Sequence, residues 1–222
     1  FSSINTAGKI AMKLDTNDKI VGVKICKDDQ DIILSTKLGK CIRFESKKLR
    51  TFKGRSSKGI KGINLGNNDS IVSLSIIDHD EKIKKNGKNG IDNKAEVKAK
   101  EKFILSITEN GYGKKSPTDE YRTQQRSGKG VYTLKKTEKT GSLVSILEVV
   151  DTDDIMIITS AGVMIRQATN EIRTIGRNTQ GVRLIRLDEG AKISSVAKVV
   201  KEEDEKEEEN EDSETKESTA EE

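Results

Sequence analysis

Short stretches in which apolar and polar residues alternate recur along this chain of 222 residues. Alternation over four to eight residues is typical of half-buried β-strands, and turns rich in Gly, Asn and Asp separate the stretches. The pattern predicts an all-β protein in which neighbouring stretches pair as hairpins. The predicted strands are 9–14, 19–25, 32–35, 40–44, 60–65, 70–75, 103–107, 112–115, 130–134, 143–147, 155–159, 163–166, 181–187 and 192–199.

The predicted hairpins follow a repeat. A Thr-x-x-Gly turn is followed, seven positions after its threonine, by a basic residue and, thirteen positions after it, by an apolar or aromatic residue. The three sets are Thr36, Arg43 and Leu49, then Thr108, Lys115 and Tyr121, then Thr159, Arg166 and Ile172. Three markers in register predict one unit of four strands copied along the chain.

A basic, glycine-closed loop belongs to each unit. Its forms are Arg55-Ser56-Ser57-Lys58-Gly59, Arg126-Ser127-Gly128-Lys129-Gly130 and Arg177-Asn178-Thr179-Gln180-Gly181, with Ile4-Asn5-Thr6-Ala7-Gly8 as a version without the arginine. The closing glycines are 51, 71 and 51 residues apart. Two equal intervals and one longer interval predict a unit of about 51 residues with one insertion.

The repeats define the expected domain organisation. About three and a half repeats make one array over residues 1–200, and an insertion interrupts it. The expected pieces are a half repeat over about 1–30, full repeats over 31–77, 102–150 and 151–200, and the insertion at 78–101. The insertion is rich in Lys, Asn, Asp and Gly, which is typical of a surface loop.

Residues 201–222 form an acidic, low-complexity tail that is expected to be disordered, because it cannot bury enough apolar surface to offset its ordering entropy. The tail holds 13 acids and 3 lysines, so the remaining body keeps 38 of the 41 basic and 24 of the 37 acidic residues, a net charge of +14. A basic body indicates a polyanionic partner, most often nucleic acid, although a solvated surface remains the alternative. One hypothesis is that the tail competes with DNA for the body, and the other is that it only improves solubility.

Catalytic and metal-binding patterns are absent from the sequence. The single histidine, His79, lies in the insertion, so a Ser-His-Asp arrangement is not expected. Gly54 to Gly59 has the glycine spacing of a phosphate loop, but Ile60 stands where the lysine of such a loop belongs. Cys26 and Cys41 are too few for a metal knuckle or a disulfide framework, which suits a reducing cytoplasm. The sequence therefore predicts a binding module without catalytic residues, metal or cofactor.

The basic loops have a physical logic for binding a polyanion. Arginine can hold a phosphate through two hydrogen bonds, lysine adds charge, and glycine lets backbone amides approach the phosphate. Contacts would be to phosphates, so little sequence preference is expected. The predicted DNA-binding residues are Arg50, Lys53, Arg55, Lys58, Lys114, Lys115, Arg122, Arg126, Lys129, Arg173, Arg177 and Arg183.

Several stretches resemble the C-terminal domain of the A component of bacterial DNA gyrase. They are TAGKIAMKL (6–14), KGIKGINL (58–65), ENGYGKK (109–115) and GRNTQGV (176–182). The resemblance implies a β-pinwheel, a propeller-like ring of four-stranded blades with strands exchanged between neighbours. It also implies wrapping of double-stranded DNA in support of ATP-dependent negative supercoiling. The implied partners are the rest of the gyrase A component and the gyrase B component in an A2B2 assembly, where ATP and Mg²⁺ act, in the bacterial cytoplasm and away from membranes.

The family also carries a basic box, Q-R-R-G-G-K-G, which Gln124 to Gly130 matches except at Gln125 and Ser127. Because this copy has only one complete repeat after it, it is interpreted as a degenerate copy, and the chain as a fragment whose true box is expected upstream of Phe1. The tyrosines Tyr112, Tyr121 and Tyr132 fall in repeat positions, so none is assigned as the DNA-linking tyrosine of the family. The alternatives are the corresponding C-terminal domain of topoisomerase IV, a propeller-like protein-interaction scaffold and, last, an enzyme built on the ring.

Overall fold

The computed structural model describes residues 4–54, 57–78 and 101–199. Within these ranges the chain forms eleven β-strands and three one-turn 3₁₀ helices, and no α-helix. The strands are β1 (Gln30–Thr36), β2 (Lys40–Glu45), β3 (Ile71–Asp78), β4 (Lys102–Thr108), β5 (Tyr112–Pro117), β6 (Val131–Tyr132), β7 (Leu143–Val150), β8 (Asp154–Thr159), β9 (Met164–Ala168), β10 (Val182–Arg183) and β11 (Ile193–Val199). The helices are η1 (Ser46–Lys48), η2 (Thr118–Glu120) and η3 (Thr169–Glu171). The all-β expectation is confirmed, and no helix in the described ranges is long and apolar enough to cross a membrane.

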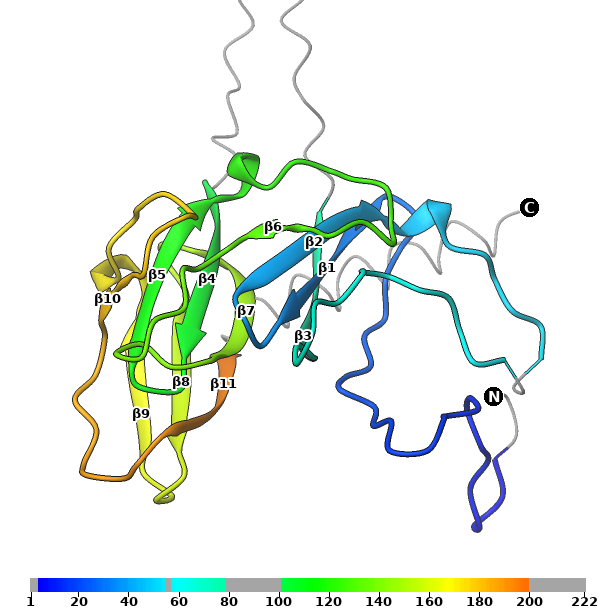
Figure 1. Ribbon diagram of the computed structural model, residues 1–222, viewed down its shortest axis with the longest axis horizontal. Coiled ribbons are helices and arrows are strands. Elements are labelled where there is room, and N and C mark those ends of the chain that lie inside the picture. The colour runs from blue at the N-terminus through cyan, green and yellow to red at the C-terminus, as the bar shows by residue number, and fades with distance from the viewer. Residues whose placement is uncertain (1–3, 55–56, 79–100, 200–222) are drawn as a thin grey trace, which may run out of the picture.

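The strands form three antiparallel sheets, which we call the first, second and third blades, arranged side by side (Figure 1). Their strand orders are β3-β1-β2-β6, β7-β4-β5-β10 and β11-β8-β9. Each blade is built on a central hairpin whose turn contains the Thr-x-x-Gly sequence, as the alternation predicted. The strands β3, β7 and β11 contact one another from blade to blade, so they form the inner edge of the array.

The fourth strand of each complete blade comes from the following repeat. Strand β6 pairs with β2, joining Tyr132 to Lys40, and β10 pairs with β5, joining Arg183 to Tyr112. The predicted second hairpins are therefore wrong, because 131–132 and 182–183 pair with the preceding blade. Their expected partners β7 and β11 return to the hairpins of their own repeats. This exchange of strands is the arrangement that the family resemblance implied.

The closing glycines lie where the chain reaches the preceding blade. Gly130 and Gly181 have φ angles of +68° and +79°, in the left-handed region that favours glycine. A Cβ atom at Gly181 would lie 2.7 Å from the carbonyl oxygen of Gly113, and one at Gly130 would collide with the carbonyl oxygen of Cys41. Both positions need glycine because the crossing chain passes directly over the backbone of β2 or β5.

The N-terminal prediction fails. Residues 9–14 and 19–25 were expected to form a hairpin, but residues 4–29 contain no strand and leave their apolar side chains exposed, up to 97% for Ile25. Residues 60–65 also form no strand. The equivalent stretches of the complete blades pair with a central hairpin. The partner of 60–65 would have to come from residues 4–29, which contain no strand, so Ile63 packs instead against Ile32 and Phe44 of the first blade. Alternation thus yields a strand only where a neighbouring edge accepts its backbone hydrogen bonds.

Two hydrophobic cores lie between the blades, and a further one, around Ile42 and Phe44, belongs to the first blade. One core joins the second and third blades and includes Phe103, Leu105 and Ile107 of β4. Another joins the first and second blades and includes Ile104 of the same strand. Because β4 contributes side chains to both cores, both of its faces are buried, which explains its nearly continuous apolar sequence.

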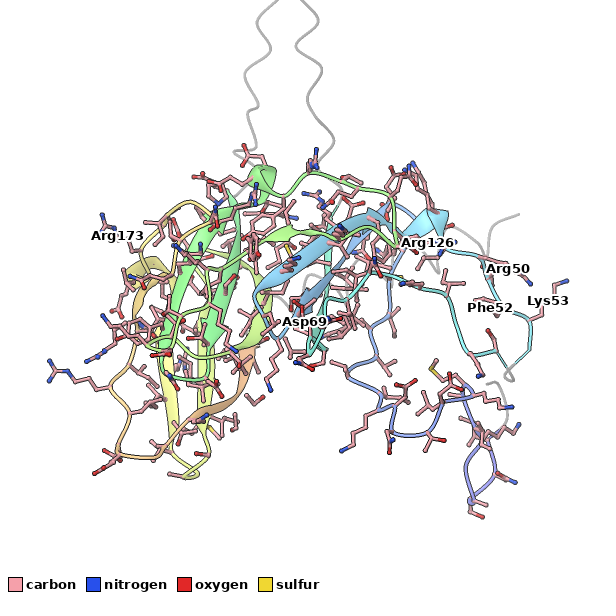
Figure 2. The ribbon with its side chains drawn as sticks, viewed as in Figure 1. Arg50, Phe52, Lys53, Asp69, Arg126 and Arg173 are labelled. Carbon is pink, nitrogen blue, oxygen red and sulfur yellow. The ribbon has the colours of Figure 1, made fainter. Side chains whose placement is uncertain are left out.

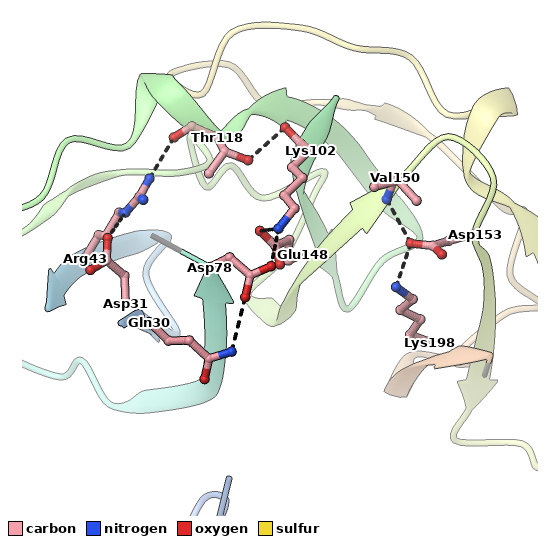
Figure 3. A network of polar contacts seen from close by, with 10 residues as sticks. All are labelled: Gln30, Asp31, Arg43, Asp78, Lys102, Thr118, Glu148, Val150, Asp153 and Lys198. Carbon is pink, nitrogen blue, oxygen red and sulfur yellow. Dashed lines mark hydrogen bonds and ion pairs between the residues drawn. The ribbon is translucent and has the colours of Figure 1, made fainter. Parts of the chain in front are cut away.

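The basic marker of each repeat forms an ion pair. Arg43 donates from Nε to a carboxylate oxygen of Asp31 at 2.7 Å, and both side chains are buried (Figure 3). Arg43 also donates to the carbonyl of Thr118 at 3.3 Å, which ties the first blade to the second. On the third blade the equivalent Arg166 pairs with Asp154 at the surface. These arginines therefore stabilise the blades, and the marker is structural.

Candidate nucleic-acid interface

Three crossing loops carry most of the predicted DNA-binding residues. We use this name for residues 49–59, 121–130 and 172–181, which run from each 3₁₀ helix to a closing glycine. The second loop docks on the first blade, where the amide of Gln124 donates to the carbonyl of Arg43 at 2.7 Å. The third docks on the second blade in the same way, through the amide of Ile175 and the carbonyl of Lys115 at 2.9 Å. The second and third loops are thus fixed to the preceding blade by backbone hydrogen bonds.

An Arg-Thr dipeptide opens every crossing loop. It occurs as Arg50-Thr51, Arg122-Thr123 and Arg173-Thr174. Thr123 and Thr174 form parallel bridges with Arg43 and Lys115 of the preceding blade. The arginine before each threonine is exposed in all three loops. All three arginines are predicted DNA-binding residues, and each directly follows the thirteen-position marker of its repeat, which is the signal for the shared dipeptide.

The second crossing loop presents two further cations. Arg126 and Lys129 are exposed, as the prediction required of DNA-binding residues. Between them, Ser127 has a φ angle of +67° and donates from its amide to the carbonyl of Gly62 at 2.6 Å. Its hydroxyl donates to the carbonyl of Lys61 at 2.9 Å. Arg126 also donates from Nη1 to this carbonyl at 3.2 Å, so the loop is held against the first repeat while both basic side chains remain exposed.

Lys114, on β5, binds the third crossing loop where the loop covers this strand. Its side chain is fully buried, and its ammonium group donates to the carbonyls of Gly176, Arg177 and Thr179 and to the hydroxyl of Thr179. Burial lowers the pKa of Lys114 to about 8. Lys114 was predicted to bind DNA directly, and the structure corrects this because the ammonium group is already enclosed by the loop that it supports.

Lys115 and Arg177 also use their charged groups for contacts within the protein. Lys115 is buried, stacks over the ring of Phe103 at 4.7 Å and pairs with Asp151, so it cannot offer its charge to DNA as predicted. Arg177 is half-buried and donates to the carbonyl of Tyr132 at 2.9 Å, which links the third repeat to the outer strand of the first blade. Arg177 therefore serves mainly as a connection between repeats.

The first crossing loop projects furthest from the blades. Arg50 and Lys53 are exposed, and Arg50 stacks over the ring of the exposed Phe52 at 5.2 Å (Figure 2). Lys58 is exposed but paired with Asp15. Arg55, the arginine of the predicted basic motif, lies outside the described residues, as do residues 79–100 of the insertion and the whole acidic tail.

The outer strands add cations of their own. Arg183, on β10, is exposed, in agreement with its choice as a candidate. Lys135 and Arg186 are exposed on the segments that follow β6 and β10, and neither is among the residues predicted from the sequence. Both stand five positions after a closing glycine, so an alignment of these two repeats indicates a shared basic position there. No cluster of His, Cys, Asp and Glu suited to a metal ion occurs in the part of the chain that the structure describes.

Comparison with known proteins agrees with this architecture. A family model described as the DNA gyrase C-terminal domain, beta-propeller, matches residues 1–27, 30–78, 102–149 and 153–199. The DNA gyrase A protein of Rickettsia felis is 37% identical over 228 aligned positions, which cover 90% of this chain and 25% of that protein. The DNA gyrase A protein of Staphylococcus epidermidis is 38% identical over 202 positions, covering 91% of this chain and 20% of that protein. The chain therefore spans at most about a quarter of the length of these relatives.

Solved structures show the same fold. A DNA gyrase A C-terminal domain superposes with a TM-score of 0.72 at 25% identity, over 87% of this chain and 59% of that one. The C-terminal domain of a DNA topoisomerase IV superposes with a TM-score of 0.69 at 23% identity, over 85% and 52% of the two chains, which supports the fold alone. The repeat, the exchanged strands and the matching family model together show that this chain belongs to the family of the DNA gyrase C-terminal domain.

Proposed function

We propose that this chain binds duplex DNA along its crossing loops and outer strands, and that it helps to wrap DNA for a gyrase. The contacts are to backbone phosphates, because the exposed groups are arginines and lysines on loops and no helix is offered to a DNA groove by the described residues. The chain's own contribution is binding, and the chemistry of strand passage belongs to other parts of such an enzyme.

The observation that carries this proposal is the repeated exposure of the arginine in the Arg-Thr dipeptide. Thr123 and Thr174 anchor the backbone on the preceding blade, so Arg122 and Arg173 stand at equivalent places on successive blades. Figure 2 shows Arg173 pointing away from one end of the array and Arg50 and Lys53 pointing away from the other. Cations repeated along a curved array favour a duplex that follows the array and bends.

The wider role follows from the relatives. The relatives reported above are DNA gyrase A proteins, so we place this chain within such a protein, working with the rest of the gyrase A component and with the gyrase B component on chromosomal DNA in the bacterial cytoplasm. Wrapping by this domain would give strand passage its direction, and thus support ATP-dependent negative supercoiling. A topoisomerase IV domain is the alternative, and it is less favoured because the similarity reported for it supports the fold alone.

The test is DNA binding by the chain in which Arg50, Arg122 and Arg173 are all replaced by alanine. Each lost phosphate contact should lower the slope of log K against log salt by about 1, so the slope should fall by about 3 and affinity at low salt by tenfold or more. Binding of a duplex of about 40 base pairs is measured by fluorescence anisotropy between about 50 and 200 mM salt, a range over which phosphate contacts change affinity strongly.

The matched control replaces Lys47, Lys48 and Lys198 by alanine. It removes the same charge from exposed lysines that already pair with Glu45 or Asp153. The control should keep most of the slope. If the wild-type chain shows no salt-dependent binding, the DNA-binding proposal is wrong and the interaction-scaffold alternative gains support. Equal losses in the two triple variants would mean that net charge, and not the crossing loops, determines binding.

A further inference from the structure

The outermost two strands of each complete blade carry a cation beside an aromatic ring, at one and the same register position. In the first blade Lys40 of β2 pairs with Tyr132 of β6, and the ammonium nitrogen lies 5.5 Å from the ring centroid. In the second blade Tyr112 of β5 pairs with Arg183 of β10, and the guanidinium carbon lies 5.5 Å from the ring centroid. In the first blade the tyrosine is on the outer strand β6, and in the second blade it is on β5, with the cation on the outer strand β10. Both blades therefore have a cation–aromatic pair at this position, although the two residue types are interchanged.

The second blade adds another cation to this pair. Lys139, from the segment between β6 and β7, places its ammonium nitrogen 5.4 Å from the centroid of the Tyr112 ring. Two cations from different repeats therefore lie near a single ring. Among the described residues neither Lys139 nor Arg183 forms an ion pair with a carboxylate. An anion that approaches this ring would therefore be attracted by both charges.

The Tyr112 hydroxyl orients the arginine. It accepts hydrogen bonds from Nε and Nη2 of Arg183 at 3.2 and 2.9 Å. The guanidinium group has five N–H donors, so the donors not used by this hydroxyl can point to a ligand. Stacking and hydrogen bonding already restrict the arginine, so a ligand costs less side-chain entropy on binding than it would with a free arginine.

We propose that Arg183, Lys139 and Tyr112 form a phosphate-binding site for the DNA backbone, separate from the crossing loops. This inference deepens the proposed function and rests on it for the source of the phosphate. A phosphodiester suits the site because its two non-bridging oxygens can accept hydrogen bonds from two separate cations.

The position of the site along the strand fits a duplex. Tyr112 starts β5, and the third crossing loop docks three residues further on, at Lys115. At about 3.3 Å per residue the two places are roughly 10 Å apart. The major groove of B-DNA is about 12 Å wide, so the site and the crossing loop can contact phosphates on the two sides of one groove. A second row of contacts would prevent the duplex from rotating about its own axis on the outer strands.

The test compares the chain carrying both Lys139→Gln and Arg183→Gln with a control carrying Lys47→Gln and Lys48→Gln. The site variant should lower duplex affinity at least tenfold at low salt and reduce the salt slope by about one to two, since up to two cations leave the interface. The control, which removes two lysines already paired with Glu45, should change affinity less than threefold. Lys139→Gln alone, which leaves the β5–β10 pairing intact, should still weaken binding several-fold if the double variant unfolds.

A second measurement separates failure of the site from failure of the proposed function. The wild-type chain is titrated with inorganic pyrophosphate while NMR follows the Arg183 Nε–H and Lys139 side-chain signals. If the wild type binds DNA and the site variants bind like the control, the site is wrong and the function stands. If the wild type does not bind DNA, the function is wrong, and the titration then decides the site. Saturable shifts of both signals would support it, and unchanged signals would overturn it.

Discussion

The first and second blades have the same strand order but hold their crossing loops by different chemistry. Under the second crossing loop lies Ile42, whose side chain lies 3.5 Å from the position of a Cβ on Gly128. The equivalent residue of the second blade is Lys114, which binds the third loop through three carbonyls and a hydroxyl. An apolar contact and an enclosed ammonium group thus serve the same architecture, so the backbone geometry tolerates a change of chemistry at a buried position.

The two blades differ again at the basic marker. In the first blade Arg43 meets Asp31 of the neighbouring strand, and both are buried. In the second blade the place of that aspartate belongs to Phe103, so Lys115 stacks on the ring and reaches the exposed Asp151 instead. The repeated cation is therefore kept while its partner changes, which makes the energetic role of the cation different in each blade.

The largest expected effect on stability comes from removing Arg43, the buried partner of Asp31 in the first blade. Arg43→Met leaves Asp31 buried without its cation and should lower the free energy of unfolding by about 3–5 kcal/mol. Lys115→Met leaves only an exposed aspartate behind, so it should cost about 1 kcal/mol or less. Urea unfolding followed by circular dichroism measures both. The control Arg166→Met breaks a surface pair, and a loss there as large as that for Arg43 would contradict this account.

Alanine at the closing glycines should have the next largest effect. Gly130→Ala should destabilise the chain by about 2–4 kcal/mol, because the left-handed backbone is strained and the Cβ strikes the carbonyl of Cys41. Gly181→Ala should cost less, because its Cβ would lie 2.7 Å from the nearest carbonyl oxygen. Gly190, with a φ angle of +77° and open space around it, provides the matched control at about 1 kcal/mol. Unfolding in urea gives the order, and equal losses at all three would exclude the crossing contact as the cause.

The smallest expected effect concerns pH. Burial lowers the pKa of Lys114 from 10.5 to about 8. Between these values the unfolded chain binds more protons than the folded chain, so stability should rise with pH in the wild type relative to Lys114→Met, by about 1–2 kcal/mol. Below pH 8 the difference between the two proteins should stay constant. Unfolding is measured at several pH values, with Ile42→Met as the first-blade control, which should show no such dependence.

The sequence was sufficient to predict the central hairpins. Thr36, Thr108 and Thr159 open turns that the structure places between paired strands, because alternation and turn chemistry are local properties. Alternation does not predict that residues 131–132 pair with β2. The second crossing loop decides this pairing, because it carries these residues to the first blade. A local pattern specifies that a segment is extended, while the neighbouring edge decides what it pairs with.

The candidate site was predicted in part for a similar reason. Arg122, Arg126 and Arg173 lie in exposed loops, as their glycine-rich surroundings suggested. Lys114 and Lys115 look like surface residues in a polar strand, but the third crossing loop covers that strand and encloses them. The cations around Tyr112 could not be seen together in the sequence, because Arg183 comes from the next repeat and reaches the Tyr112 ring only through strand exchange.

The exchange of strands also sets where such a protein can be cut or extended. A cut between the sequence repeats, for example near residue 101, would remove Val131 and Tyr132 and so leave the first blade without its outer strand. Evolutionary duplication of one repeat meets no such difficulty, because an inserted copy completes the sheet before it and is completed by the copy after it. The sequence repeat and the blade therefore do not begin and end at the same residues. A stable truncation should end after a strand that completes the preceding blade.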